Sequence, residues 1–79
     1  MIVTNIDRTI DARGMACPGP LMSLIGAVRE GQVGTVIEVL SSDEGSRIDI
    51  PAWVAKAGHE LEDVAQEDGF ARFVVRKAR

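Results

Sequence analysis

The chain has 79 residues, of which 46% are hydrophobic and 27% are charged, and its formal net charge is −3. This length allows one domain, residues 1–79, with one modest core. The sequence has no tyrosine, one tryptophan and two phenylalanines, so we expect a mainly aliphatic core. The negative charge argues against direct nucleic-acid binding, which normally requires a basic face.

No apolar run approaches the roughly 20 residues that cross a membrane, and the N-terminus lacks the basic start and apolar block of a signal peptide. These patterns predict a cytoplasmic protein with no membrane partner. Cys17 and His59 are the only residues of their types. The sequence therefore predicts no internal disulfide, no metal site and no cofactor.

Apolar residues alternate in the first predicted strand, run almost continuously through residues 35–40, and recur at i, i+3, i+4 and i+7 in the predicted helices. The predicted elements are, in chain order, a strand at 6–11, a helix at 18–30, a strand at 35–40, a helix from about 48 to 57, and strands at 60–67 and 71–77. Pro51 is expected in the first turn of its helix, because a deeper proline would disrupt it. Asp68 and Gly69 predict a hairpin between the last two strands.

This βαβαββ order predicts an α/β (α+β) two-layer sandwich, in which a four-stranded mixed sheet carries two helices on one face. The first crossover should be right-handed. Gly26 lies within a predicted helix, where glycine is unfavourable, and a closely packed neighbouring element would explain its presence.

The stretch at residues 11–20 places Cys17 at the start of the first predicted helix. Pro18 and Pro20 suit the first helical turn, where a missing N–H is harmless. The helix N-terminus favours a thiolate, so we expect the pKa of Cys17 to lie below the free value of about 8.5. Gly14 predicts a sharp turn, and Gly19 leaves the approach to the sulfur open.

Arg13 is the cation nearest to Cys17 in the sequence and could strengthen the positive field. The alternative is that Cys17 is inert, because free cysteine often packs as a small hydrophobe. His59 is expected to be a charged partner for the end of the second helix rather than a catalytic base. A thiol without a base suits chemistry such as carrying sulfur as a persulfide.

The pattern Asp11-x-x-Gly14-x-x-Cys17-Pro18-x-Pro20 resembles the signature of the TusA/SirA-like small sulfur carriers. The resemblance extends over nearly the whole chain. It includes Gly34, Asp43, Asp49-Ile50-Pro51, Gly58-His59-Glu60-Leu61 and Gly69.

The resemblance implies a sulfurtransferase-type carrier that works with partner enzymes rather than as an autonomous catalyst. Cys17 would take sulfur, as a persulfide or thiosulfonate, from a cysteine desulfurase or a rhodanese. It would pass this sulfur to a DsrE-like acceptor, in tRNA thiolation or in sulfur oxidation. The residues that support the motif would be Asp11, Gly14, Pro18, Gly19 and Pro20.

The candidate residues for partner docking are Arg13, Met15, Met22 and Arg29. Met15 and Met22 make the surroundings of the thiol apolar, although methionines at these positions could equally pack in the core. The alternative function is a non-enzymatic regulatory or interaction module in which Cys17 is structural or a redox sensor.

Overall fold

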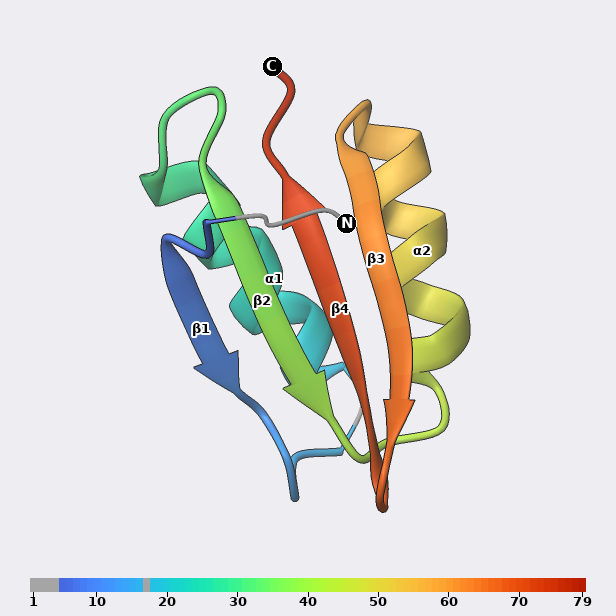
Figure 1. The fold of residues 1–79 in the computed structure, drawn as a ribbon. Helices are drawn as coiled ribbons and strands as arrows, with labels where there is room; N and C mark the ends of the chain where they lie inside the picture. The colour runs from blue at the N-terminus through green and yellow to red at the C-terminus, as the bar shows by residue number, and fades with distance from the viewer. Residues whose placement is uncertain (1–4, 17) are drawn as a thin grey trace.

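The computed structural model describes residues 5–16 and 18–79, and Figure 1 shows the arrangement of their helices and strands. In chain order, the elements are β1 (Arg8–Asp11), α1 (Gly19–Glu30), β2 (Val36–Ser41), α2 (Ser46–Ala57), β3 (Glu60–Glu67) and β4 (Phe70–Arg76). The predicted βαβαββ order is confirmed.

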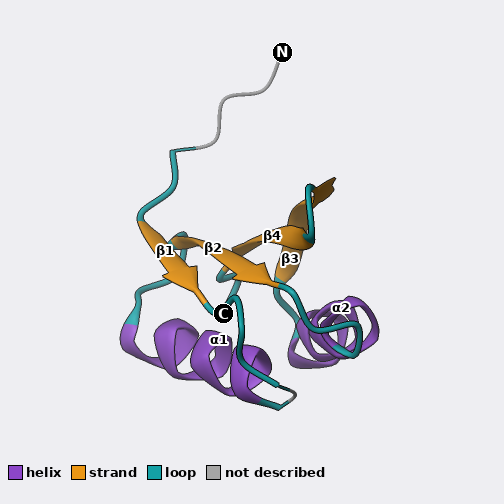
Figure 2. Cartoon of the chain, turned by 90° about the horizontal axis from the view of Figure 1, so that it is seen from below, coloured by secondary structure: helices purple, strands orange, loops and turns teal. Residues whose placement is uncertain are grey.

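The four strands form one mixed sheet in the order β1-β2-β4-β3. The central strand β2 pairs in parallel with β1 and antiparallel with β4, so that Val39 lies opposite both Ile10 and Phe73. Both helices cover the same face of this sheet (Figure 2), which confirms the two-layer sandwich. In the described part of the chain, neither helix is long and apolar enough to cross a membrane.

The core lies between the helices and the covered face of the sheet. Phe73 is the largest side chain that is fully buried there, and its neighbours are aliphatic. The predicted helical stripes supply the other layer of this core. Its helical members are Leu24, Ala27 and Val28 from α1 and Ile50 and Val54 from α2.

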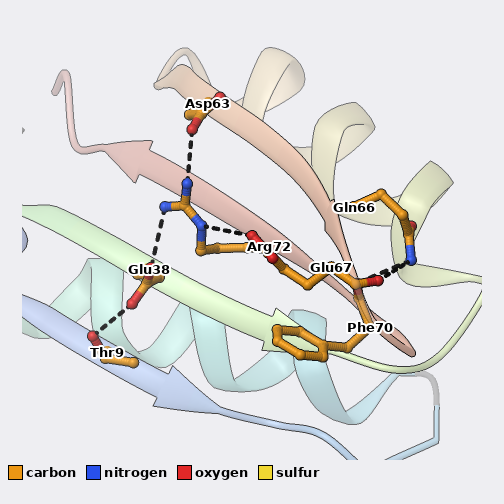
Figure 3. Close-up of polar contacts among 7 residues, drawn as sticks. All are labelled: Thr9, Glu38, Asp63, Gln66, Glu67, Phe70 and Arg72. Carbon is orange, nitrogen blue, oxygen red and sulfur yellow. Dashed lines mark hydrogen bonds and ion pairs between the residues drawn. The ribbon is translucent and has the colours of Figure 1, made fainter. Parts of the chain in front are cut away.

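A row of polar side chains crosses the open face and includes residues from all four strands (Figure 3). Thr9 donates a hydrogen bond of 2.9 Å to Glu38, and the other carboxylate oxygen of Glu38 lies 3.2 Å from Arg72. Arg72 also reaches Asp63 at 3.0 Å and Glu67 at 3.8 Å. The open face therefore links its strands by ion pairs as well as by backbone hydrogen bonds.

Two predicted starts are wrong by about two residues, whereas the other boundaries agree within one residue. The first strand begins at Arg8 instead of residue 6, because the Asp7 carboxylate accepts a 2.9 Å hydrogen bond from the backbone N–H of Val36. Pro51 lies in the second turn of α2 instead of the first. The helix starts earlier because N–H groups such as those of Arg47 and Ile48 bond to carbonyls three residues back, in a 3₁₀ pattern ahead of the proline.

Three connecting segments gather at one end of the molecule, the lower end in Figure 1. They are residues 12–16 after β1, residues 42–45 after β2, and residues 67–70 at the β3–β4 turn. We call this region the loop end. Since β1 and β2 are parallel, α1 and α2 both begin there.

Ile37 tests the packing of the covered face. Ile37→Val should lower the free energy of unfolding by about 0.5–1.5 kcal/mol, because Ile37 is fully buried in the core. Ile48→Val is the matched control, since Ile48 is 74% exposed, and it should change that free energy by less than about 0.5 kcal/mol. Urea unfolding of both variants measures the difference, and equal effects would contradict this packing.

Gly26 provides a second test. Apart from its chain neighbours and the nearby backbone of its own helix, a β-carbon at Gly26 would meet no described atom within 4 Å, so the close neighbour suggested by the sequence is not found. Gly26→Ala should therefore stabilise α1 by about 0.5–1 kcal/mol in urea unfolding. The same change at Gly14 should cost about 1–2 kcal/mol, because Gly14 has a φ of +86°. Destabilisation by Gly26→Ala would contradict the open space around Gly26.

Candidate functional site

The loop end brings the residues before α1 against two segments that are distant in the sequence. The backbone N–H of Gly14 donates a 2.9 Å hydrogen bond to the Ser42 hydroxyl. The Arg13 guanidinium lies over the Phe70 ring, with its carbon 4.9 Å from the ring centroid. Cys17, the predicted thiol, lies outside the described residues.

Asp11 and Arg13 form a two-pronged ion pair at the end of β1. The Arg13 Nε and Nη2 atoms each lie 2.8 Å from a carboxylate oxygen of Asp11, and the backbone N–H of Arg13 adds a 3.2 Å bond. The side-chain hydrogen bond from Arg13, followed by the backbone one, lowers the pKa of Asp11 to about 2. The charge of Arg13 is thus balanced by Asp11, and Arg13 adds less positive field than the sequence suggested.

The turn that precedes the thiol is closely defined. Ala12 is fully buried, and its N–H bonds to the carbonyl of Leu40 at 2.9 Å, which continues the β1–β2 pairing. The N–H of Met15 bonds back to the carbonyl of Ala12 at 3.1 Å, across a Gly14 with positive φ. The predicted turn at Gly14 is therefore present, and glycine allows its left-handed conformation.

The start of α1 is held by its backbone and by a buried proline. The N–H of Gly19 bonds to the carbonyl of Ala16 at 2.8 Å, and the N–H of Met22 bonds to the carbonyl of Pro18 at 2.9 Å. Pro18 is exposed at the N-cap, whereas Pro20 is fully buried. Both prolines lie where a helix tolerates them, as predicted.

Met15 and Met22 lie on the surface. They are 42% and 59% exposed, respectively, so core packing does not account for them. A β-carbon on Gly19 would lie 3.1 Å from the terminal methyl of Met15, so this glycine leaves room for the Met15 side chain against the helix start. No charged residue occurs in the sequence from 14 to 28, so this stretch carries no side-chain charge around the exposed methionines.

Arg29 is not brought to this site. It lies in the last turn of α1, and the helical rise of 1.5 Å per residue separates it from Gly19 by about 15 Å. Its sequence neighbour Glu30 pairs there with Arg8 at 2.8 Å. Of the four candidate docking residues, the structure therefore gathers Arg13, Met15 and Met22 near the start of α1.

His59 lies beyond the C-terminal end of α2, whereas the loop end contains the helix N-termini. Its Nδ1 accepts a 3.0 Å hydrogen bond from the N–H of Ala78. Burial, and then the nearby charges of Lys77 and Arg79, lower the pKa of His59. His59 is therefore a neutral hydrogen-bond acceptor at neutral pH, and its predicted role as a charged helix partner is wrong.

Sequence reasoning missed several residues of the loop end. Two of them contact the segment after β1: Ser42 through Gly14 and Phe70 through Arg13. The other two are Gln66, which bonds to Phe70, and Arg47, which bonds to Gln66. The only signal in the sequence was the predicted hairpin at Asp68 and Gly69. Its position beside the segment after β1 depends on the strand order.

The polar groups of the described residues do not form a metal site. No group of three or more histidine, cysteine, aspartate or glutamate side chains in residues 5–16 and 18–79 is arranged to hold an ion. One Asp43 carboxylate oxygen is buried and receives no hydrogen bond within the described part of the chain.

Comparisons with known proteins cover nearly the whole chain. The family described as "Sulfurtransferase TusA" matches residues 8–77. A protein of Archaeoglobus fulgidus named "Putative sulfur carrier protein" is 56% identical over 89% of this chain and 96% of its own. "Sulfur carrier protein TusA" of Pseudomonas entomophila is 41% identical over 90% of this chain and 89% of its own.

A solved structure has the same fold. The crystal structure of a SirA-like protein from Desulfitobacterium hafniense superimposes with a TM-score of 0.80, at 26% sequence identity. The match covers 91% of this chain and 99% of that one. The two-layer arrangement of four strands and two helices is thus shared with a SirA-like protein.

The lowered pKa of His59 predicts a pH-dependent stability. The unfolded chain binds the proton more readily, so the contribution of His59 is full above its ordinary pKa of about 6.5 and is lost as the pH falls through the lower folded value. Urea unfolding across this range should show a steeper pH dependence for the wild type than for His59→Gln. Parallel curves would contradict the neutral state of His59 in the fold.

Proposed function

Because this chain belongs to the sulfurtransferase TusA family, we propose that it is a carrier that holds a transferable sulfur atom on Cys17. The observation that carries the proposal is the position of α1, which begins at Gly19, directly after the Cys17-Pro18 pair. A helix N-terminus favours a thiolate, and the thiolate is the nucleophilic form. Gly14 and Pro20, which lie on either side of Cys17 in the chain, are both held by the fold, the first by its bond to Ser42 and the second by burial.

The proposed transfer conserves atoms and electrons. The Cys17 thiolate attacks the terminal sulfur of a donor persulfide, the donor's sulfur–sulfur bond breaks, and the donor cysteine leaves as a thiolate. A thiolate of the acceptor then attacks the terminal sulfur on Cys17 in the same way and releases the Cys17 thiolate. Both steps exchange one thiolate for another, so neither requires a general base.

The proposed partners are proteins. The donor would be a cysteine desulfurase or a rhodanese, and the acceptor a DsrE-like protein, within the cytoplasm. Met15 and Met22 are exposed near the helix start, where methionines can adapt to an apolar partner surface. Asp11 already balances the charge of Arg13, so Arg13 would contact a partner without adding net charge to the interface. Arg29 would contact only a partner that extends along α1.

The proposal also assigns roles to the remaining motif residues. Asp11 orients Arg13, Gly14 allows the turn, and Gly19 makes room for Met15. Residues 1–79 would act as one carrier domain.

Sulfur loading tests this function. The chain is incubated with thiosulfate and a rhodanese, or with cysteine and a cysteine desulfurase, and its intact mass is measured. We expect a gain of one sulfur atom, which dithiothreitol removes, whereas a thiosulfonate load would add the sulfonate oxygens as well. Cys17→Ser should gain nothing, because it lacks the accepting thiolate.

Equal loading of the Cys17→Ser variant would end the carrier proposal. Loading of neither protein by either donor, together with reversible oxidation of Cys17 by peroxide, would favour the alternative of a redox-sensing regulatory module.

A further inference from the structure

The β3–β4 hairpin is connected to the segment that precedes Cys17 and also to α2. Phe70, the first residue of β4, lies under the Arg13 guanidinium. Gln66, near the end of β3, accepts a hydrogen bond from Arg47 in the first turn of α2. The hairpin therefore joins the first segment of the loop end to the start of the second helix.

Gln66 uses both ends of its side-chain amide. Its oxygen accepts from Arg47, and its nitrogen donates to the carbonyls of Glu67 and Phe70, at 2.9 Å and 3.0 Å. Figure 3 shows this side chain beside the turn. These hydrogen bonds to the carbonyls at the two ends of the hairpin loop hold the backbone of Phe70. They therefore also hold the backbone position from which the Phe70 ring extends.

Arg13 is held from two directions. The Asp11 carboxylate binds it edge-on through Nε and Nη2, and the Phe70 ring supports the guanidinium from its face. Planar guanidinium groups suit both kinds of contact at once, which a lysine would not. The backbone of Arg13 is thereby fixed between the sheet and the hairpin.

The segment after Arg13 runs directly to the thiol. Gly14 is bonded to Ser42, and the chain enters α1 at Gly19. Contacts from β4 and from the segment after β2 thus restrain the residues that precede Cys17 in the chain. The burial of Pro20 restrains the residues that follow it.

We propose that Phe70 and Gln66 are positioning residues for the segment that leads to the thiol: the hairpin holds Arg13, and Arg13 in turn holds residues 13–16, which directly precede Cys17 in the chain. The inference rests on the proposed function of Cys17. Loss of this restraint should lower the reactivity of the Cys17 thiol, whose thiolate the N-terminus of α1 is proposed to stabilise.

These contacts are suited to positioning more than to stability. The Arg13 and Asp11 side chains are about half exposed, and exposed ion pairs contribute little to the free energy of unfolding. A change in thiol reactivity can therefore be separated from unfolding.

The experiment measures the rate of Cys17 alkylation by iodoacetamide between about pH 5 and pH 10, which reports the thiolate fraction. In Phe70→Leu, the midpoint should move towards the free-thiol value and the rate at neutral pH should fall about threefold or more. Phe70→Tyr keeps the ring face and should restore the wild-type profile. Leu61→Ala truncates an exposed apolar residue near the start of β3, away from the turn, and should leave the profile unchanged.

The charged residues within the loop end and those next to it in the chain are the same in the wild type, Phe70→Leu, Phe70→Tyr and Leu61→Ala, so their titration cancels in the comparison. They are Asp11, Arg13, Asp43, Glu44, Arg47, Asp49, Glu67 and Asp68.

Two further variants keep the test decisive. Gln66→Ala retains the ring but releases the hairpin backbone, and it should slow alkylation in the same direction even if Phe70→Leu folds poorly. Arg13→Gln combined with Phe70→Leu should be no slower than Arg13→Gln alone, because both changes remove the same contact.

A wild-type profile in folded Phe70→Leu and Gln66→Ala would overturn the proposal, as would equal slowing in Phe70→Leu and Phe70→Tyr. Alkylation needs no sulfur donor. A failure of sulfur loading therefore counts against the carrier function, and an unchanged alkylation profile counts against the positioning role.

Discussion

The pairing of β2 with both β1 and β4 is the constraint on which the rest of the structure depends. Because β1 and β2 are parallel, both strands end on the same side of the sheet. After each of them the chain turns back as a helix. The antiparallel partner of β2 places the β3–β4 turn at that same end. One backbone register therefore gathers three connecting segments and two helix N-termini.

The charges on this scaffold are largely satisfied internally. Arg72 lies among Glu38, Asp63 and Glu67 on the open face, and Arg13 lies between Asp11 and Phe70 at the loop end. Such pairs orient side chains more than they stabilise the fold, because most of their members remain in contact with water. The surface around the start of α1 is left with exposed methionines and no charge from residue 14 to residue 28.

This arrangement suits a carrier. A protein that exchanges sulfur with two partners needs an accessible thiol, and its proposed reaction needs a stable thiolate but no enclosed substrate pocket. The contacts that hold Gly14 and Pro20 lie on either side of Cys17 in the chain. Partner recognition is then left to the exposed side chains around the helix start.

Local patterns determined much of this protein. Apolar spacing is a property of neighbouring residues, and it predicted all six elements and the layers they form. The order Cys17-Pro18-Gly19-Pro20 likewise predicted a helix start directly after Cys17, because proline preferences act within one turn, and α1 begins at Gly19. Local rules failed at Pro51, where the first turn of α2 forms ahead of the proline.

Only the tertiary structure decided what surrounds that segment. The contacts of Arg13 with Phe70 and of Gly14 with Ser42 join residues far apart in the chain, and they follow from the strand order, which periodicity does not reveal. For the same reason the sequence suggested a free cation at Arg13 and a charged His59. The fold pairs the first with Asp11, and burial together with two nearby cations keeps the second neutral.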